Sequence, residues 1–147
     1  DHDRNPQLSL GVMYFDLDNF KKLNDTYGHP FGDKVLVGIA GTIKGIVRKG
    51  DLAIRYGGEE IVVVMLAEKQ EDIVNVAHRI RLESDNRVFT FHDQKISITI
   101  SGGIAFREPG EDFIEVINRA DEKLYIAKEN GRDNLVFQVF DQSPKEA

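Results

Sequence analysis

The sequence contains no cysteine and no tryptophan, and it has only two methionines and four prolines among 147 residues. Without cysteine the chain can form neither disulfide bonds nor thiolate metal sites, which fits a reducing compartment. No apolar run approaches the ~18 residues that a membrane-spanning helix needs. No signal-peptide pattern opens the chain. These absences exclude a disulfide scaffold and a membrane-spanning chain.

Basic residues are also fewer than acidic ones. The chain has 19 Lys and Arg and 25 Asp and Glu, which give a net charge of −6. This balance argues against charge-driven binding to DNA, RNA or anionic lipid. It leaves room for one small nucleotide held by a metal and a local basic cluster. The hydrophobic share of 41% is typical of a globular chain, and the length fits one domain.

Periodicity and turn residues predict the elements. Strands are expected at residues 8–16, 95–106 and 134–140, with a hairpin at 51–66. Helices are expected from a cap at Asp18 or Asn19 to Gly28, from 31 to 48 with Gly50 closing the helix, from 70 to 86, and from 112 to 130. The domain would span residues 8–140, with a lead-in at 1–7 and a flexible tail at 141–147. The order contains a split βαβ core, so we expect an α+β fold with one mixed sheet flanked by helices.

The most informative segment is RYGGEE followed by Ile61. Gly57 and Gly58 between two apolar runs indicate a tight hairpin turn, because glycine accepts the positive φ angles of such turns. Adjacent carboxylates at Glu59 and Glu60 can hold a divalent cation. Together they suggest a phosphate-bearing ligand bound through a metal.

Asp16 ends the first strand, and it would meet Glu59 at one rim if the two strands are neighbours. Such hard oxygen ligands suit Mg²⁺ and leave positions for phosphate oxygens. The alternative is that these acidic residues form turns or cap helices.

Three further pairs of polar residues are ambiguous by spacing alone. Asn24 and Asp33 flank a glycine-containing turn that could face a purine edge, but capping of the next helix by Asp33 is the favoured interpretation. Lys128 and Arg132 at a helix end either complement the helix dipole or neutralise triphosphate oxygens. The remaining pair, Arg48 and Asp51, is best explained as a surface ion pair, although it could also bind a guanine edge with its phosphate.

Four blocks in this order resemble the GGDEF domain, the catalytic domain of diguanylate cyclases. The blocks are FDLDNFKKLNDTYGHPFGD (15–33), RYGGEE (55–60), ISGG (100–103) and RADEKLYIAKENGRDN (119–134). The resemblance implies a mostly antiparallel, palm-like sheet similar to that of nucleotide cyclases and polymerases. It also implies the condensation of two GTP molecules into cyclic di-GMP with release of two pyrophosphates.

The resemblance assigns roles to individual residues. Asp16, the carbonyl of Leu17, Glu59 and Glu60 would hold Mg²⁺, for which Mn²⁺ can substitute. Glu59 would also accept the 3′-hydroxyl proton, and Glu60 would support the second metal position. Asn24 and Asp33 would read the guanine. The rest of the GTP site would be formed by His29, Phe20, Lys21, Gly58, Lys128 and Arg132.

A product-inhibition site is also implied by the resemblance, because Arg48 and Asp51 match the family's Arg-x-x-Asp motif. Arg79 matches a secondary arginine of that site. With the family pattern in view, product binding is favoured over a plain ion pair.

The sequence departs from the family pattern at three points. Ile61 replaces a Phe, so we expect altered packing near the turn and lower activity. Gly102 replaces a larger apolar residue, which would loosen its strand. The family's opening helix is missing, so we expect that the chain is excised from a longer protein with a sensory or dimerising domain upstream.

The resemblance therefore favours a cytoplasmic enzyme domain that acts as a homodimer, although regions outside this chain could attach the protein to a membrane. The alternative is a degenerate GGDEF domain that binds cyclic di-GMP without making it. A third interpretation, a metal-dependent nucleotidyl transferase with another substrate, is weakened by the guanine-reading pair.

Overall fold

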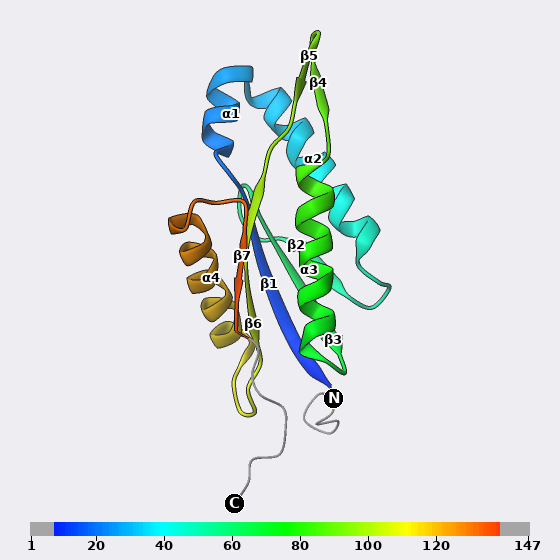
Figure 1. Ribbon diagram of the computed structural model, residues 1–147, viewed down its shortest axis with the longest axis vertical. Helices are drawn as coiled ribbons and strands as arrows, with labels where there is room; N and C mark the ends of the chain where they lie inside the picture. Colours follow the sequence, from blue (N-terminus) through cyan, green and yellow to red (C-terminus); the bar gives the residue numbers. More distant parts are fainter. Residues whose placement is uncertain (1–7, 139–147) are drawn as a thin grey trace, which may run out of the picture.

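The computed structural model describes residues 8–138, which form one five-stranded sheet, a small two-stranded sheet and the helices that pack on them (Figure 1). The elements in chain order are β1 (Ser9–Leu17), α1 (Phe20–Tyr27), α2 (His29–Ile46), β2 (Leu52–Arg55), β3 (Glu60–Ala67), α3 (Gln70–Asp85), β4 (Phe89–Phe91), β5 (Gln94–Ile96), β6 (Ile100–Phe106), α4 (Phe113–Glu129) and β7 (Leu135–Phe137). The predicted α+β class is confirmed.

The five-stranded sheet has the order β2-β3-β1-β6-β7 and is antiparallel except for the parallel pair β6–β7. The central strand β1 is buried on both sides, as its nearly continuous apolar sequence predicts. Successive side chains alternate between two cores. Val12 and Tyr14 belong to the cluster that includes residues of α4, whereas Met13 and Phe15 belong to the larger cluster with residues of α1, α2 and α3. Figure 1 shows α4 and α3 on opposite sides of the sheet.

The strand register places the end of β1 beside the hairpin turn. Asp16 lies opposite Glu60 on β3 and opposite Ser101 on β6. The Leu17 amide donates to the Glu59 carbonyl at 3.3 Å. The condition on which the sequence-based metal site depended, that β1 and the hairpin are neighbours, is therefore met.

Two predicted helix ends were wrong. Neither Asp18 nor Asn19 caps α1 through its side chain, because Asn19 takes a left-handed conformation with φ of 56°. The helix α2 ends at Ile46, and the extended conformation of Val47 follows it. Gly50, which was expected to close this helix, has φ of 104° in the turn before β2.

The predicted strand at residues 95–106 was also wrong, since it is two strands. β5 pairs with β4 in a separate two-stranded sheet, and β6 pairs with β1 in the main sheet. The intervening residue Ile98 is buried, so the alternating pattern continues through a segment without ladder pairing.

The last strand is shorter than predicted within the described residues, because β7 ends at Phe137. The predicted lead-in at 1–7, the tail at 141–147 and the end of the strand at 139–140 lie outside the described residues.

Gly102 does not loosen β6. An added Cβ there would lie 2.7 Å from Leu135 Cδ2 and 2.8 Å from Phe15 Cδ1, so neighbouring side chains already fill the space. The Gly102 amide also donates to the Asn134 carbonyl at 3.0 Å. The glycine thus permits close packing of β6 between β1 and β7.

Candidate active site

The hairpin turn differs from the tight turn that the sequence suggested. Four residues, 56–59, connect β2 to β3, and neither Gly57 nor Gly58 has a positive φ. A Cβ on Gly57 would lie 2.2 Å from Glu60 Oε1, whereas a Cβ on Gly58 would have no heavy atom within 4 Å. Gly57 therefore makes room for the Glu60 carboxylate, and Gly58 leaves its backbone open to a ligand.

Arg55 holds the turn by a hydrogen bond, in which its Nη2 donates to the Gly58 carbonyl at 2.9 Å. The Tyr56 amide donates to the Glu60 carbonyl at 2.8 Å. These bonds define the position of Glu59, the residue between them, at the edge of the sheet beside Leu17.

Asp16 is a buried carboxylate with only one of its oxygens paired. The Lys128 ammonium lies 2.8 Å from Oδ2, and Oδ1 is buried without a hydrogen-bond partner. Burial raises the pKa of Asp16 to about 6, the Lys128 charge acts in the opposite direction, and Glu59 and Glu60 raise it further. An unpaired buried carboxylate oxygen is costly and is a ready ligand for a cation.

Beside this pair lies an open cavity of about 510 Å³. It brings together side chains from β1, α1, the hairpin turn and the end of α4, which the sequence separates widely. The lining residues are Leu17, Asn19, Phe20, Lys21, Lys22, Asp25, Glu59, Lys128 and Arg132. Six of them were predicted site residues, and the cluster of four cations gives an otherwise acidic chain a local site for a polyanion.

The cavity contains residues that sequence reasoning missed. Lys22 and Asp25 follow Lys21 on α1, and their helical spacing could have pointed to them. Asn19 precedes the helix and was interpreted only as a cap.

Asp18 was also missed as a contributor to this region. It is 2% exposed and accepts hydrogen bonds from the Thr99 and Ser101 hydroxyls, both at 2.7 Å. The Asp133 amide donates to it at 3.0 Å. Arg132 and Asp133 both have positive φ, at 64° and 50°. Asp18 therefore holds the loop from which Arg132 reaches the cavity.

Glu60 is not among the residues that line this cavity. Its carboxylate hydrogen-bonds Tyr14, and burial followed by the Glu60 charge raises the pKa of the Tyr14 hydroxyl. Within residues 8–138, no three Asp, Glu, His or Cys side chains converge into a group that could hold a metal ion. Asp16 and Leu17 nevertheless end β1 beside Glu59, the last residue of the turn before β3, and their oxygens are the hard donor type that Mg²⁺ prefers.

The predicted guanine-reading residues lie at the corner between α1 and α2. Asn24 Oδ1 is buried without a partner, and a Cβ on Gly32 would lie 1.7 Å from it. His29 begins α2 and Asp33 follows within the helix, both exposed. Asp33 therefore does not cap this helix, which excludes the interpretation that spacing alone favoured.

The predicted product site lies at another edge of the molecule. The Asp51 carboxylate accepts from the Arg48 backbone amide at 2.8 Å, and its Oδ2 lies 3.4 Å from Arg48 Nε. Arg48 Nη2 also donates to the Leu66 carbonyl at 2.9 Å. Arg48 lines a cavity of about 460 Å³ together with residues from the end of β3 and with Asp72 and Val76 of α3. Arg79, further along α3, pairs with Glu83.

No helix in the described part of the chain is both long enough and apolar enough to cross a membrane.

The family model described as "Diguanylate cyclase, GGDEF domain" matches residues 1–134. Diguanylate cyclase A of Treponema denticola is 38% identical over 128 residues, which are 86% of this chain and 34% of that protein. Diguanylate cyclase DgcZ of Escherichia coli is 37% identical over 130 residues, which are 88% of this chain and 44% of that protein. The chain thus spans less than half of either curated relative.

Solved structures have the same fold. Diguanylate cyclase SiaD of Pseudomonas aeruginosa, in complex with its activator SiaC, has a TM-score of 0.88 at 36% identity, covering 93% of this chain and 52% of that one. The GGDEF domain of DgcB from Caulobacter crescentus, in complex with c-di-GMP, has a TM-score of 0.85 at 32% identity, covering 90% and 79%. The active GGEEF domain of a diguanylate cyclase from Vibrio cholerae has a TM-score of 0.83 at 30% identity, covering 97% and 88%.

Proposed function

Because the chain belongs to the GGDEF family of diguanylate cyclase domains, we propose that it condenses two GTP molecules into cyclic di-GMP and two pyrophosphates. The observation that carries the proposal is the cavity that gathers Glu59 with Lys21, Lys128 and Arg132 beside the buried carboxylate of Asp16. A carboxylate base next to a polyanion site is what attack of a ribose hydroxyl on a nucleoside triphosphate requires.

In each half of the proposed reaction, Glu59 accepts the proton of a 3′-hydroxyl. The oxygen attacks the α-phosphorus of the other GTP, the new O3′–P bond forms, and the bond to the pyrophosphate oxygen breaks. Lys21, Lys128 and Arg132 neutralise the triphosphate, with Arg132 able to form a two-pronged contact and the lysines acting as point charges. Phe20 and the open backbone at Gly58 complete the walls of the ribose and phosphate site.

We assign Mg²⁺, or Mn²⁺ in its place, to Asp16, the Leu17 carbonyl and Glu59, with Glu60 supporting a second metal position. The unpaired Oδ1 of Asp16 supports this assignment, because a buried oxygen without a donor is suited to a cation. When bound, the metal supplies neutralisation of the crowded phosphate. In this structure Asp16 pairs with the Lys128 ammonium. A metal bound to Asp16 would replace this ammonium and free Lys128 to contact the triphosphate.

The corner between α1 and α2 would select guanine. Guanine presents adjacent N–H donors to a carboxylate, whereas adenine does not, so Asp33 favours GTP over ATP. Asn24 offers a buried amide oxygen without a partner, and Gly32 makes room for this amide because it has no side chain. His29 lies nearby on the first turn of α2.

Cyclic di-GMP would act as an inhibitor at Arg48 and Asp51, with Arg79 as a secondary contact. The cavity beside Arg48 supports this role, because the exposed Arg48 guanidinium there can bind a guanine edge or a phosphate. Glu83 would have to release Arg79 for that contact.

Each domain would bind one GTP, so catalysis requires two copies face to face. An upstream sensory or dimerising segment in the full-length protein would control their encounter. The relatives named above are longer than this chain, which agrees with such an arrangement.

One observation favours a second function, a degenerate domain that only binds cyclic di-GMP. Ile61 replaces the aromatic residue of the family signature directly after Glu60. The intact set of Asp16, Glu59, Glu60 and Lys128 favours the enzyme over this receptor.

The deciding experiment is chromatography of GTP incubated with concentrated protein and Mg²⁺, with Glu60→Ala in parallel. Cyclic di-GMP formed by the parent chain and lost in the variant would support the cyclase. If neither forms product, the assay is repeated with a dimerising segment fused upstream. Continued absence of product together with cyclic di-GMP binding that Arg48→Ala abolishes would favour the receptor.

A further inference from the structure

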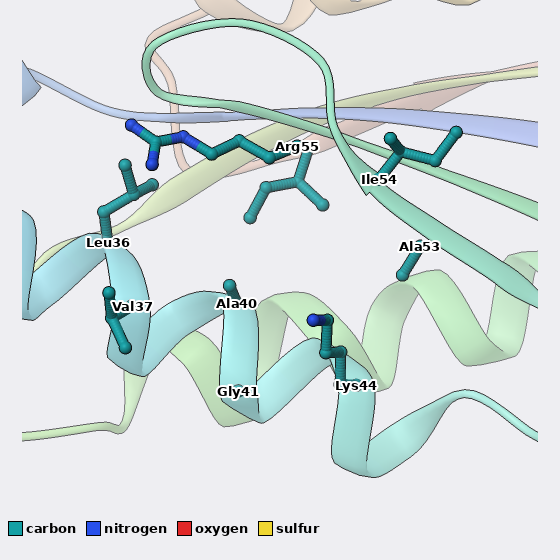
Figure 2. A pocket seen from close by; sticks show the side chains of 9 residues that line it. Leu36, Val37, Ala40, Gly41, Lys44, Ala53, Ile54 and Arg55 are labelled. Carbon is teal, nitrogen blue, oxygen red and sulfur yellow. The ribbon is translucent and has the colours of Figure 1, made fainter.

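A second pocket, of about 380 Å³, lies between α2 and the β2–β3 hairpin and shares no lining residue with the cavity around Glu59. Figure 2 shows helix α2 below and the hairpin above, with side chains from both projecting into the space between them. Its volume falls within the range of small-molecule sites in proteins. None of the roles assigned above uses it.

The walls of this pocket are apolar. Leu36 and Ala40 come from α2, Ala53 comes from β2, and Ile61 comes from the beginning of β3. Ile61 is 3% exposed and stands where the family signature has the larger Phe. On the helix side, Gly41 lines the pocket, and a Cβ added there would have no heavy atom within 4 Å. Gly41 on the helix side and Ala53 on the hairpin side therefore leave the space open.

Two cations stand at the pocket, Lys44 on α2 and Arg55 on β2, and its lining contains no acidic residue. In Figure 2 the Lys44 ammonium points from α2 into the apolar space, and the Arg55 guanidinium lies at the end of this space beside Leu36. Both side chains are exposed. In a chain of net charge −6, a pocket with apolar walls and only positive charge at its rim is complementary to an apolar molecule with one anionic end.

We propose that this pocket binds a small apolar carboxylate, with its hydrocarbon part against Ile61 and Ala40 and its carboxylate at Lys44 and Arg55. Arg55 already donates to the Gly58 carbonyl, next to Glu59. A carboxylate bound by Arg55 is therefore linked through this residue to the turn that carries Glu59. The site does not depend on the proposed cyclase activity, and its test measures binding alone.

The test is titration of the 147-residue chain with sodium octanoate, followed by calorimetry and by backbone amide NMR. The expected result is saturable binding with a dissociation constant of ~1 mM or tighter, accompanied by amide shifts at Gly41 and Gly58. Lys44→Gln should weaken octanoate binding while leaving the weaker binding of octanol unchanged.

The structure offers a matched pair of variants on α2. Gly41→Leu places a side chain in the pocket and should weaken octanoate binding by ~10-fold or more. Gly45→Leu adds the same side chain one turn later, where a Cβ also has open space but does not line the pocket. It should leave the affinity within ~2-fold. Thermal melting of both variants checks that they fold.

Ile61→Phe is a second filling variant from the other wall and should also weaken binding. The proposal is overturned if octanoate does not bind the parent chain, or if Gly41→Leu and Ile61→Phe both bind it as tightly as Gly45→Leu does. It is also overturned if the shifted amides lie around Lys128 and Arg132, since octanoate would then occupy the polyanion cavity.

Discussion

At the scale of single residues, Asp33 is the proposed determinant of base choice and is also an exposed residue of α2. Asp33→Ala should weaken GTP binding by ~10-fold or more and leave ATP binding unchanged, because a hydrogen bond to a charged acceptor contributes ~1.5–3 kcal/mol. Calorimetric titration of both nucleotides measures the two affinities. Lys34→Ala, the next residue along the helix, is the control. Equal weakening of GTP and ATP would show that Asp33 acts on the phosphates or on folding.

Asp85 provides a prediction about pH and stability. Burial, followed by its hydrogen bond with Asp133, raises the pKa of Asp85 from 3.8 to about 7, although the Ile100 amide and Arg81 act in the opposite direction. The folded state thus holds the proton more tightly than the unfolded state does. This contribution to stability is complete below pH 4 and is lost as the pH rises towards 7.

Asp85→Asn removes this titration and keeps an oxygen that accepts from the Ile100 amide, a bond of 3.1 Å. Arg81 retains Asp133 as a partner at 2.8 Å. The variant should gain stability relative to the parent chain between pH 5 and pH 8, by an amount on the order of 1 kcal/mol. Urea unfolding at several pH values measures the difference. A constant difference across this range would mean that Asp85 is already ionised at pH 5.

The hydrogen bonds of single residues were harder to predict from the sequence. Asp18 was interpreted as a helix cap because it precedes a helix. Its partners Thr99, Ser101 and Asp133 lie 81 to 115 residues away along the chain. No local pattern can reveal such distant hydrogen bonds. The neighbouring positions of Asp16 and Glu59 were predicted because the flanking strands carry strong local signals.

At the scale of elements, the close packing of α4 against β6 depends on Gly103. A Cβ on this residue would lie 2.2 Å from the Ala120 carbonyl oxygen and 2.3 Å from the Leu124 amide nitrogen. Backbone atoms of a helix cannot move aside singly, so Gly103→Ala should push α4 off the sheet. We expect a loss of about 3 kcal/mol in the free energy of unfolding, at the upper end of overpacking costs.

Gly102→Ala is the matched control for this prediction. Its Cβ would meet the side chains of Leu135 and Phe15 rather than backbone. Side chains can rotate, so the cost should be smaller, about 1 kcal/mol. Chemical denaturation followed by circular dichroism compares the two variants. If Gly102→Ala were the more costly, the contact between β6 and α4 would not be the controlling one.

The presence and type of an element were predicted correctly where it has a long apolar pattern, as in α2, α3 and α4. The β4–β5 hairpin was missed because each of its strands has only 3 residues. Residues 97–99 show the alternating sequence pattern of a strand because Ile98 is buried and the Thr99 hydroxyl donates to Asp18. Burial with period two therefore does not require a neighbouring strand.

At the scale of the whole molecule, charge is distributed unevenly. The chain is acidic overall, yet four cations line the cavity beside Glu59. This separation favours a small polyanion over a long nucleic acid, because these cations gather at one cavity while the chain as a whole is net negative.

The requirement for two copies gives the last prediction. If one domain binds one GTP, the turnover per chain should rise in proportion to protein concentration while the chain is mostly monomeric. A parallel coiled coil fused ahead of the chain should make turnover per chain independent of concentration. Pyrophosphate release measured from nanomolar to micromolar protein tests both statements. Constant turnover in the unfused, monomeric chain would contradict the requirement.

A mixed dimer makes the requirement more specific. When parent chains are paired with Glu59→Ala chains through complementary coiled coils, only one of the two 3′-hydroxyls has its base. One bond then forms and the other does not, so the linear dinucleotide pppGpG should accumulate in place of cyclic di-GMP. Chromatography separates the two products. Cyclic product at the parent rate from this mixed dimer would mean that Glu59 is not the base, whereas loss of both products would mean that Glu59 is needed to bind the substrate.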